Sequence, residues 1–379
     1  MNEKRLVIAL FGIGVAAVLG FLAYRFIAPL TVSVFLYYST RRYFKSLRRL
    51  RLPKRVRAAT VLASLAIPLV LLISYAAVLL VIEARAFITQ YSLLDVAATN
   101  FEWMGGVDQI PEFTVQGLYE AYQSGDLSPF IAFASEHATF LTSLVSGFVL
   151  NLFIVTIVTY YLLIDGHRIR DWLLRFDDEA VIREYLEAVD SELESVLFGN
   201  LLNVIAISLI AIAAFSGYNA LVPAAAEVPY PALAGTLTGI ASLVPVVGMK
   251  IVYLPLTVVA ALPIMLGGDP SMLVYIVGFL FVAVIIVDTV PDLVLRPLLS
   301  GETTHVGLLM LAYTLGPVVL GFYGLFFAPI VLVIGLTFAE TALPQLLGAD
   351  EDGGLSSDQM QLSDFVERKS FRTSLRDRI

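Results

Sequence analysis

The sequence predicts an all-α, polytopic membrane protein with about six full crossings and two re-entrant helical hairpins in an inverted arrangement. Apolar residues make up 58% of its 379 residues, and its mean hydropathy is +0.84. Soluble domains contain about 45–50% apolar residues, so the composition places the chain in the membrane class. Two long apolar runs, each interrupted by Pro and Gly, predict the hairpins.

The first run, residues 232–266, contains a single charged residue, Lys250. One helix crosses the hydrocarbon core in roughly 20 residues, and the stretch from Pro245 to Gly248 would break a helix near the middle of the run. We therefore predict two half-length helices joined inside the membrane, with Pro245 and Gly248 at the tip. A full crossing with a Pro kink is the alternative, because Pro is frequent in membrane helices.

The second run, residues 306–339, is uncharged and is interrupted by Gly316 and Pro317, where we expect the second tip. Unwound backbone is tolerated at membrane depth only where protein or water covers it, and pairs of broken segments indicate a transporter site. If the first run is a hairpin, Arg296 lies in the cytoplasm, in accord with the positive-inside rule. The two hairpins then enter from opposite faces.

Loop charges predict the topology. Residues 41–57 contain nine Lys or Arg and no acid, which places them in the cytoplasm, where they orient the chain, contact anionic lipid or bind a partner. Residues 83–136 contain eight acids and one Arg and are expected outside, as a lid or a spacer. Both termini are predicted to be cytoplasmic, and residues 347–379 form a polar tail after a transporter domain of residues 1–346.

Residues 165–198 are charged and predict a cytoplasmic amphipathic helix. The spacing of three and four residues between its apolar positions is typical of one helix face, and those positions are Ile182, Tyr185, Leu186, Val189, Leu193, Val196 and Leu197. This face is free in the sequence to pack on the bundle, on another subunit or on lipid.

Several stretches, taken together and in order, resemble the AI-2E family of transporters. They are YYLLIDGHRIR at residues 160–170, VPVVG at 244–248, DLVLRPLLSG at 292–301 and GFYGLFFAP at 321–329. The resemblance assigns motif positions to Asp165, Gly166, Gly199, Asp292, Arg296, Pro297, Gly321, Gly324 and Pro329. The chain departs from the family pattern at Val246, Met249 and Leu293, and Lys250 is an added charge.

The resemblance implies export of a small polar solute such as autoinducer-2, coupled to a gradient of H⁺ or Na⁺, by a homo-oligomer in the cell membrane. A Na⁺(Li⁺)/H⁺ antiporter of the same family, a passive channel and a scaffold protein are the alternatives. No cofactor is implied.

Asp288, Asp292 and Arg296 share a helical stripe if the helix continues through Pro291. A carboxylate inside a membrane is a candidate carrier of a proton or cation, and we favour Asp288 because it follows seventeen uncharged residues. Asp292 is either a second carrier or the partner of Arg296 in an ion pair that fixes the helix end.

The remaining candidates are Lys250 and the glycines. Lys250 either meets an anionic or carbonyl-rich solute or extends its ammonium to the membrane surface, which we favour. With Lys250, the residues predicted to bind solute are Pro245, Gly248, Gly316 and Pro317. For Gly321 and Gly324 we favour close helix packing.

Other functional classes have little support in the sequence. There is no Cys, and the three His lie far apart without metal-ligand spacing, so no metal site is predicted. No phosphate-binding loop of an ATP-driven pump is present, and no enzyme constellation appears. The net charge of −8 argues against nucleic-acid binding.

The predicted topology is testable because the chain has no native cysteine. In intact cells, an impermeant thiol reagent should label Asp126→Cys and leave Ser46→Cys unlabelled until the membrane is opened. Labelling of Ser46→Cys alone would reverse the assigned orientation.

Overall fold

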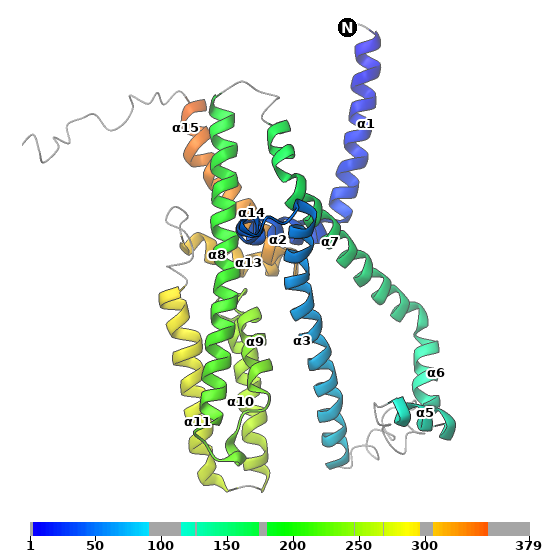
Figure 1. Cartoon of the computed structure of the whole chain (residues 1–379), viewed down its shortest axis with the longest axis vertical. Coiled ribbons are helices and arrows are strands. Elements are labelled where there is room, and N and C mark those ends of the chain that lie inside the picture. Colours follow the sequence, from blue (N-terminus) through cyan, green and yellow to red (C-terminus); the bar gives the residue numbers. More distant parts are fainter. Residues whose placement is uncertain are drawn as a thin grey trace, which may run out of the picture.

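The computed structural model describes residues 3–90, 115–125, 127–173, 180–245, 247–267, 269–295 and 306–347. All regular elements in these ranges are helices, and seven of them are long and apolar enough to cross a membrane (Figure 1). The prediction of an all-α, multi-pass membrane protein is confirmed.

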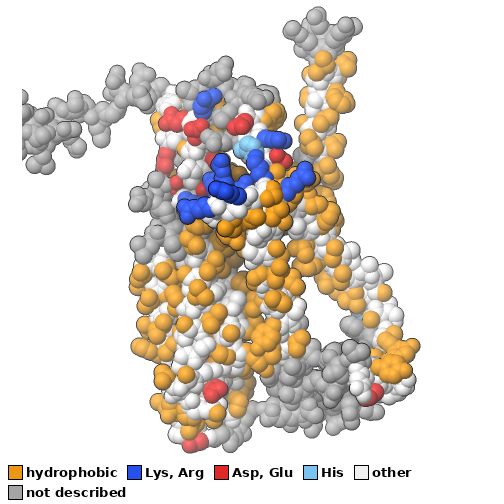
Figure 2. Space-filling view, viewed as in Figure 1, with side chains coloured by type: hydrophobic (Ala, Val, Ile, Leu, Met, Phe, Trp, Pro, Cys, Tyr) orange, Lys and Arg blue, Asp and Glu red, His pale blue; other side chains and the backbone are white. Residues whose placement is uncertain are grey.

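The first helices contain most of the basic segment 41–57, which was predicted to be a cytoplasmic loop. Helix α1 (Glu3–Arg25) extends away from the other helices in Figure 1, whereas α2 (Ile27–Ser46) lies across the middle of the molecule and is seen along its axis. The short helix η1 (Leu47–Leu50) then leads to α3 (Lys54–Gln90). Figure 2 shows Lys and Arg gathered at the level of α2 and a mostly hydrophobic surface below it, as expected where a bilayer ends.

Two short helices, α5 (Val115–Ser124) and α6 (Ser128–Glu136), precede α7 (Ala138–Leu173). The segment at 165–198 does not form one separate helix. Its first residues end α7, and its amphipathic part begins α8 (Ala180–Asn219), which continues without interruption into the next apolar stretch. The apolar face of α8 packs on the bundle of the same chain, because Leu193, Val196 and Leu197 join Phe35 and Phe326 in one buried cluster.

The first long run forms a helical hairpin of α9 (Pro231–Ala241) and α10 (Gly248–Gly267). A turn joins the two helices at the predicted place, and the Gly248 N–H donates to the Val244 carbonyl at 3.0 Å. Helix α9 lies against α8. At Gly239 the two backbones approach so closely that a Cβ would lie 2.6 Å from the backbone nitrogen of Ser208.

The short helix η3 (Ala224–Ala226) precedes this hairpin. After the hairpin, the short helix η4 (Pro270–Met272) leads into α11 (Leu273–Val282). This helix continues as two π-helical segments, η5 (Ala283–Thr289) and η6 (Pro291–Leu295). Pro291 has no N–H, and its ring would clash with the carbonyl four residues earlier in an α-helix. A wider π turn is one way to keep the chain helical through such a residue.

The second run also forms a hairpin, of α13 (Val306–Leu320) and α14 (Gly324–Thr337), which continues into η7 (Phe338–Ala342) and α15 (Leu343–Leu346). The tip predicted at Gly316 and Pro317 is wrong, because both residues lie inside α13. The turn begins at Gly321, whose φ of 79° is a left-handed conformation that glycine adopts without strain. Gly321 therefore forms the turn, whereas Gly324 and Gly316 lie in close backbone contact.

The two hairpins occupy different levels of the molecule in Figure 1. Hairpin α9–α10 lies beside the lower half of α8, and α13–α14 lies near the level of α2, with α15 at the upper end. Their insertion from opposite faces of a bilayer stays a prediction.

Close packing of α9 on α8 leads to a testable difference between glycines. Gly239→Ala should lower the free energy of unfolding by about 1–3 kcal/mol, because backbone atoms of Ser208 must move. Gly278→Ala is the matched control, since no atom lies within 4 Å of its Cβ position, and it should be neutral or stabilising by up to about 1 kcal/mol. Thermal unfolding of the two variants in detergent compares them, and equal midpoints would contradict the packing role.

Candidate functional site

Lys250 and Tyr253 of α10 meet Asp288 of η5 in the apolar core. The Lys250 ammonium lies 2.7 Å from Asp288 Oδ2, and the Tyr253 hydroxyl donates a hydrogen bond to the same oxygen at 2.9 Å. The Asp288 side chain is 7% exposed and that of Lys250 is 40% exposed. The group therefore links a buried carboxylate to the surface through one lysine.

The local structure explains this arrangement. Lys250 and Tyr253 are three residues apart and so lie on the same face of α10, directly after the hairpin turn. Asp288 lies in a π-helical segment, where the Thr289 hydroxyl donates to the Val284 carbonyl at 2.7 Å. Such segments frequently occur at functional sites.

The surroundings of Asp288 are apolar. Tyr253, Phe279, Ala283 and Val287 belong to one buried cluster of α8, α9, α10, α11 and η5, and residues 195–219 of α8 contain no charged residue. A buried carboxylate without a partner is costly, and removal of one partner from a buried ion pair typically costs 3–5 kcal/mol. Lys250 and Tyr253 therefore supply the polar contacts of the Asp288 carboxylate inside this core.

Asp292 and Arg296, the other predicted coupling residues, are only partly described. Asp292 lies in η6 and is partly buried. Arg296 and Pro297 lie outside the described residues, so the proposed Asp292–Arg296 pair stays a prediction.

The family-motif residues lie in several places. Asp165 is paired with Arg168 at 3.4 Å on α7. Gly166 lies against Tyr37, whose hydroxyl would be 2.7 Å from a Cβ at that position. Gly199 is inside α8, and Pro329 is buried in α14.

Two asparagines of α8 carry buried polar atoms near the first hairpin tip. Asn200 Nδ2 and Asn203 Oδ1 have no hydrogen-bond partner within the described part of the chain, and Asn203 is 4% exposed. In the antiparallel register of α8 and α9, Gly235 faces Ile212 and Gly239 faces Ser208. Continuation of this register beyond the end of α9 places Val244 of the turn at the level of Asn203.

The same region adjoins the second hairpin. Leu243 and Val244 of the first turn pack against a buried cluster that contains Leu309 and Tyr313 of α13, together with Leu325 and Phe326 of α14. Leu197, one helical turn before Asn200, belongs to this cluster. The two asparagines therefore lie next to the part of α8 that packs with both hairpins.

A second polar group joins α2 to α8. Arg41 Nη1 lies 2.6 Å from Asp190 Oδ1, and Glu194 contacts Arg41, Arg42 and Lys45 at distances of 3.2, 3.4 and 2.8 Å. Burial opposes the charge on Arg41, but the hydrogen bond to Asp190 and the neighbouring charges outweigh it and raise the Arg41 pKa. We call these residues, together with Tyr38, the α2–α8 charge cluster.

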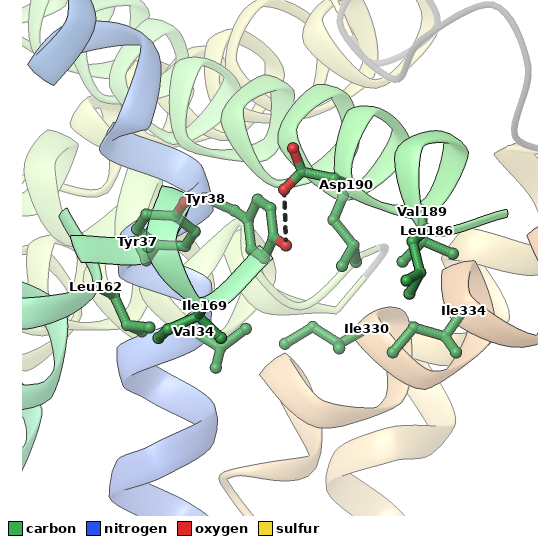
Figure 3. A pocket seen from close by; sticks show the side chains of 12 residues that line it. Val34, Tyr37, Tyr38, Leu162, Ile169, Leu186, Val189, Asp190, Ile330 and Ile334 are labelled. Atoms are coloured by element: carbon green, nitrogen blue, oxygen red, sulfur yellow. Dashed lines mark hydrogen bonds between the residues drawn. The ribbon is translucent and has the colours of Figure 1, made fainter. Parts of the chain in front are cut away.

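A cavity of about 420 Å³ lies next to this cluster, between α2, α7, α8 and α14 (Figure 3). Tyr38 faces it and donates to Asp190 Oδ1 at 3.1 Å. Burial, with Asp190 nearby, raises the Tyr38 pKa above its ordinary value. The remaining lining is mostly apolar and comes from Val34, Tyr37, Leu162, Gly166, Ile169, Leu186, Val189, Leu193, Ile330 and Ile334.

Sequence reasoning missed Tyr253, the Asn203 position and the pairing of α2 with α8. The spacing of three residues between Lys250 and Tyr253, which puts both on one helix face, was a signal for Tyr253. The opposite charges of residues 41–57 and of the amphipathic segment were a signal for the last. Within the described ranges, no group of three or more His, Asp or Glu side chains could hold a metal ion.

Comparison with known proteins gives consistent matches. The sequence profile of the AI-2E family of transporters matches residues 6–343. A protein of Archaeoglobus fulgidus, whose name assigns it an inferred role in transport, is 26% identical over 75% of this chain and 79% of its own length. A similarly named protein of Methanothermobacter thermautotrophicus is 31% identical over 46% of this chain and 49% of its own. A third, from Methanocaldococcus jannaschii, is 25% identical over 48% of this chain and 52% of its own. The profile match spans nearly the whole chain, all seven membrane-spanning candidates included in whole or in large part, and the chain therefore belongs to the AI-2E family of transporters.

Proposed function

We propose that the chain is a secondary transporter that exports a small polar solute bound between the two hairpins, with ion exchange at Asp288. The family supports transport rather than an enzymatic reaction. The buried contact of Asp288 with Lys250 and Tyr253 is the observation that supports coupling most directly. An intramembrane carboxylate joined to a mobile element is suited to carry a proton or cation.

The proposed solute contacts are Asn200 and Asn203 with the backbone of the first turn. One asparagine presents a donor, Nδ2, and the other an acceptor, Oδ1, and both atoms are buried. The described N–H groups of the turn already donate to carbonyls of α9 or of the turn itself, so the turn offers carbonyl oxygens, each of which can accept a further hydrogen bond. Together these groups suit an uncharged solute with hydroxyl or carbonyl groups, because they offer hydrogen bonds without net charge.

The cavity beside the α2–α8 charge cluster is the weaker candidate for this solute. Its lining is mostly apolar, and Asp190 already accepts hydrogen bonds from Arg41 and Tyr38. A polar solute there would lose water contacts and gain few hydrogen bonds in return.

Asp288 connects the first hairpin to η5, and this contact is the proposed link between ion binding and the solute site. The ion pair holds α10 against η5. A proton on Asp288 removes its charge and so weakens the attraction to Lys250. Movement of the hairpin would then open the space beside Asn203.

Na⁺(Li⁺)/H⁺ exchange, a passive channel and a scaffold role are the competing functions. A channel would conduct the solute without an ion gradient. An exchanger would move protons in response to Na⁺ or Li⁺ alone, without any organic solute. A scaffold would tolerate loss of Asp288.

Asp288→Asn tests the coupling. In proteoliposomes loaded with a pH-sensitive dye, the wild type should move protons when a panel of small polar solutes, autoinducer-2 first, is supplied on one side. Asp288→Asn should move protons at least about tenfold more slowly than the wild type. Its rate should also no longer depend on pH, because an amide does not titrate. Glu227→Gln, an exposed loop acid, is the matched control and should behave as wild type. An unchanged rate and pH profile in Asp288→Asn would exclude this residue as the coupling site.

Asn203→Ala tests the solute contact. Loss of one hydrogen bond of about 0.5–1.5 kcal/mol should raise the half-saturating solute concentration about twofold to tenfold and leave the pH profile unchanged. Thermal stability should change little, because Asn203 Oδ1 has no partner among the described residues in the empty protein. A large loss of stability with unchanged solute affinity would indicate a purely structural residue.

A further inference from the structure

Lys250 is an added charge in the region of the family's turn motif, and the structure gives it a definite partner. Its ammonium lies 2.7 Å from Asp288 Oδ2. The same oxygen accepts from Tyr253 at 2.9 Å. Two donors on the chain's own hairpin thus occupy one of the two oxygens of the Asp288 carboxylate.

An alkali cation and an ammonium compete for such a carboxylate. Each carries one positive charge and approaches a carboxylate oxygen closely, and two cations at the same carboxylate repel each other. A cation that binds Asp288 must therefore first displace the lysine. Because Lys250 is covalently attached to the hairpin, it is always present at high effective concentration.

We infer that Lys250 is a built-in cation that replaces Na⁺ or Li⁺ at Asp288, so that this chain uses protons alone as coupling ions. This rests on the proposed role of Asp288. In the exchange step, a proton adds to the Asp288 carboxylate and forms a neutral carboxylic acid, and the Lys250 ammonium keeps its charge and leaves the carboxylate. Loss of the proton restores the ion pair.

The groups around Asp288 support a proton rather than a metal ion. From α10 it faces Lys250 and Tyr253, and η6 brings the nearby Asp292. Residues 273–282 of α11 and 195–219 of α8 contain no charged residue. The exposed part of Lys250 gives the pair contact with the surface of the chain.

The test measures Na⁺ and Li⁺ binding without any organic solute. The purified full-length protein in detergent is heated in choline chloride, NaCl or LiCl at equal ionic strength, and ²²Na⁺ binding is measured by equilibrium dialysis. We expect the wild type to bind no ²²Na⁺ and its unfolding midpoint to shift by less than about 1 °C. Lys250→Met should bind ²²Na⁺, and its midpoint should rise by about 2–4 °C at a saturating concentration, since a ligand that binds only the folded state stabilises it.

Three further variants make the result specific. Lys250→Met/Asp288→Asn should lose the Na⁺ response, because the carboxylate is gone. Lys250→Arg should resemble the wild type, since a guanidinium also supplies the charge. Tyr253→Phe keeps the ion pair and should likewise bind no Na⁺.

Two outcomes would overturn the inference. One is Na⁺ binding by the wild type that Asp288→Asn abolishes, which does not require Lys250→Met to fold. The other is a folded Lys250→Met that binds no Na⁺. Either leaves the proposed function standing if Asp288→Asn still loses proton movement, whereas a fully active Asp288→Asn would remove the proposed function itself.

Discussion

A carboxylate buried among apolar side chains requires a compensating charge, and this requirement organises the centre of the molecule. Asp288 follows Phe279, Ala283 and Val287 of a buried apolar cluster. Among the described residues, the basic side chain that pairs with it, Lys250, comes from another helix. The first hairpin must therefore place the beginning of α10 beside η5. Proline at 291 contributes in turn, because the π turns around it set where Asp288 lies on the helix.

Close helix contacts hold α9, the first helix of this hairpin, against α8. Inside a membrane no hydrophobic effect drives helices together, so small residues and van der Waals contact hold them. Gly235 and Gly239 let α9 approach the backbone of α8, and Gly316 and Gly324 do the same within the second hairpin. Gly278 of α11 and Gly335 of α14 make no such contact, since no atom lies within 4 Å of a Cβ position there. Helix α9 is thus fixed on α8, and α10 contacts η5 through the Lys250–Asp288 ion pair and the apolar cluster that both elements share.

The sequence predicted the hairpins because Pro and Gly interrupt runs that are too long for one crossing. It placed the first turn correctly, where Pro245 and Gly248 fall together, and misplaced the second. Pro317 is compatible with a helix when its neighbours satisfy the backbone, and the turn follows Gly321 instead, whose left-handed conformation ends α13. Lys250 and Asp288 are 38 residues apart. Their pairing depends on how two helices pack, which periodicity along one segment does not contain.

Among the described residues, the α2–α8 charge cluster and the Asp288 site differ in how many contacts hold each carboxylate. In the α2–α8 charge cluster, Asp190 and Glu194 contact three basic residues, and loss of one proton or one contact leaves several others in place. At Asp288 a single carboxylate oxygen accepts from both Lys250 and Tyr253, so loss of that oxygen's charge would weaken both interactions at once. The charge on Asp288 is also more strongly buried than any in the cluster. Under the proposed mechanism, α10 is the element that a proton on Asp288 would release, whereas α9 stays packed on α8.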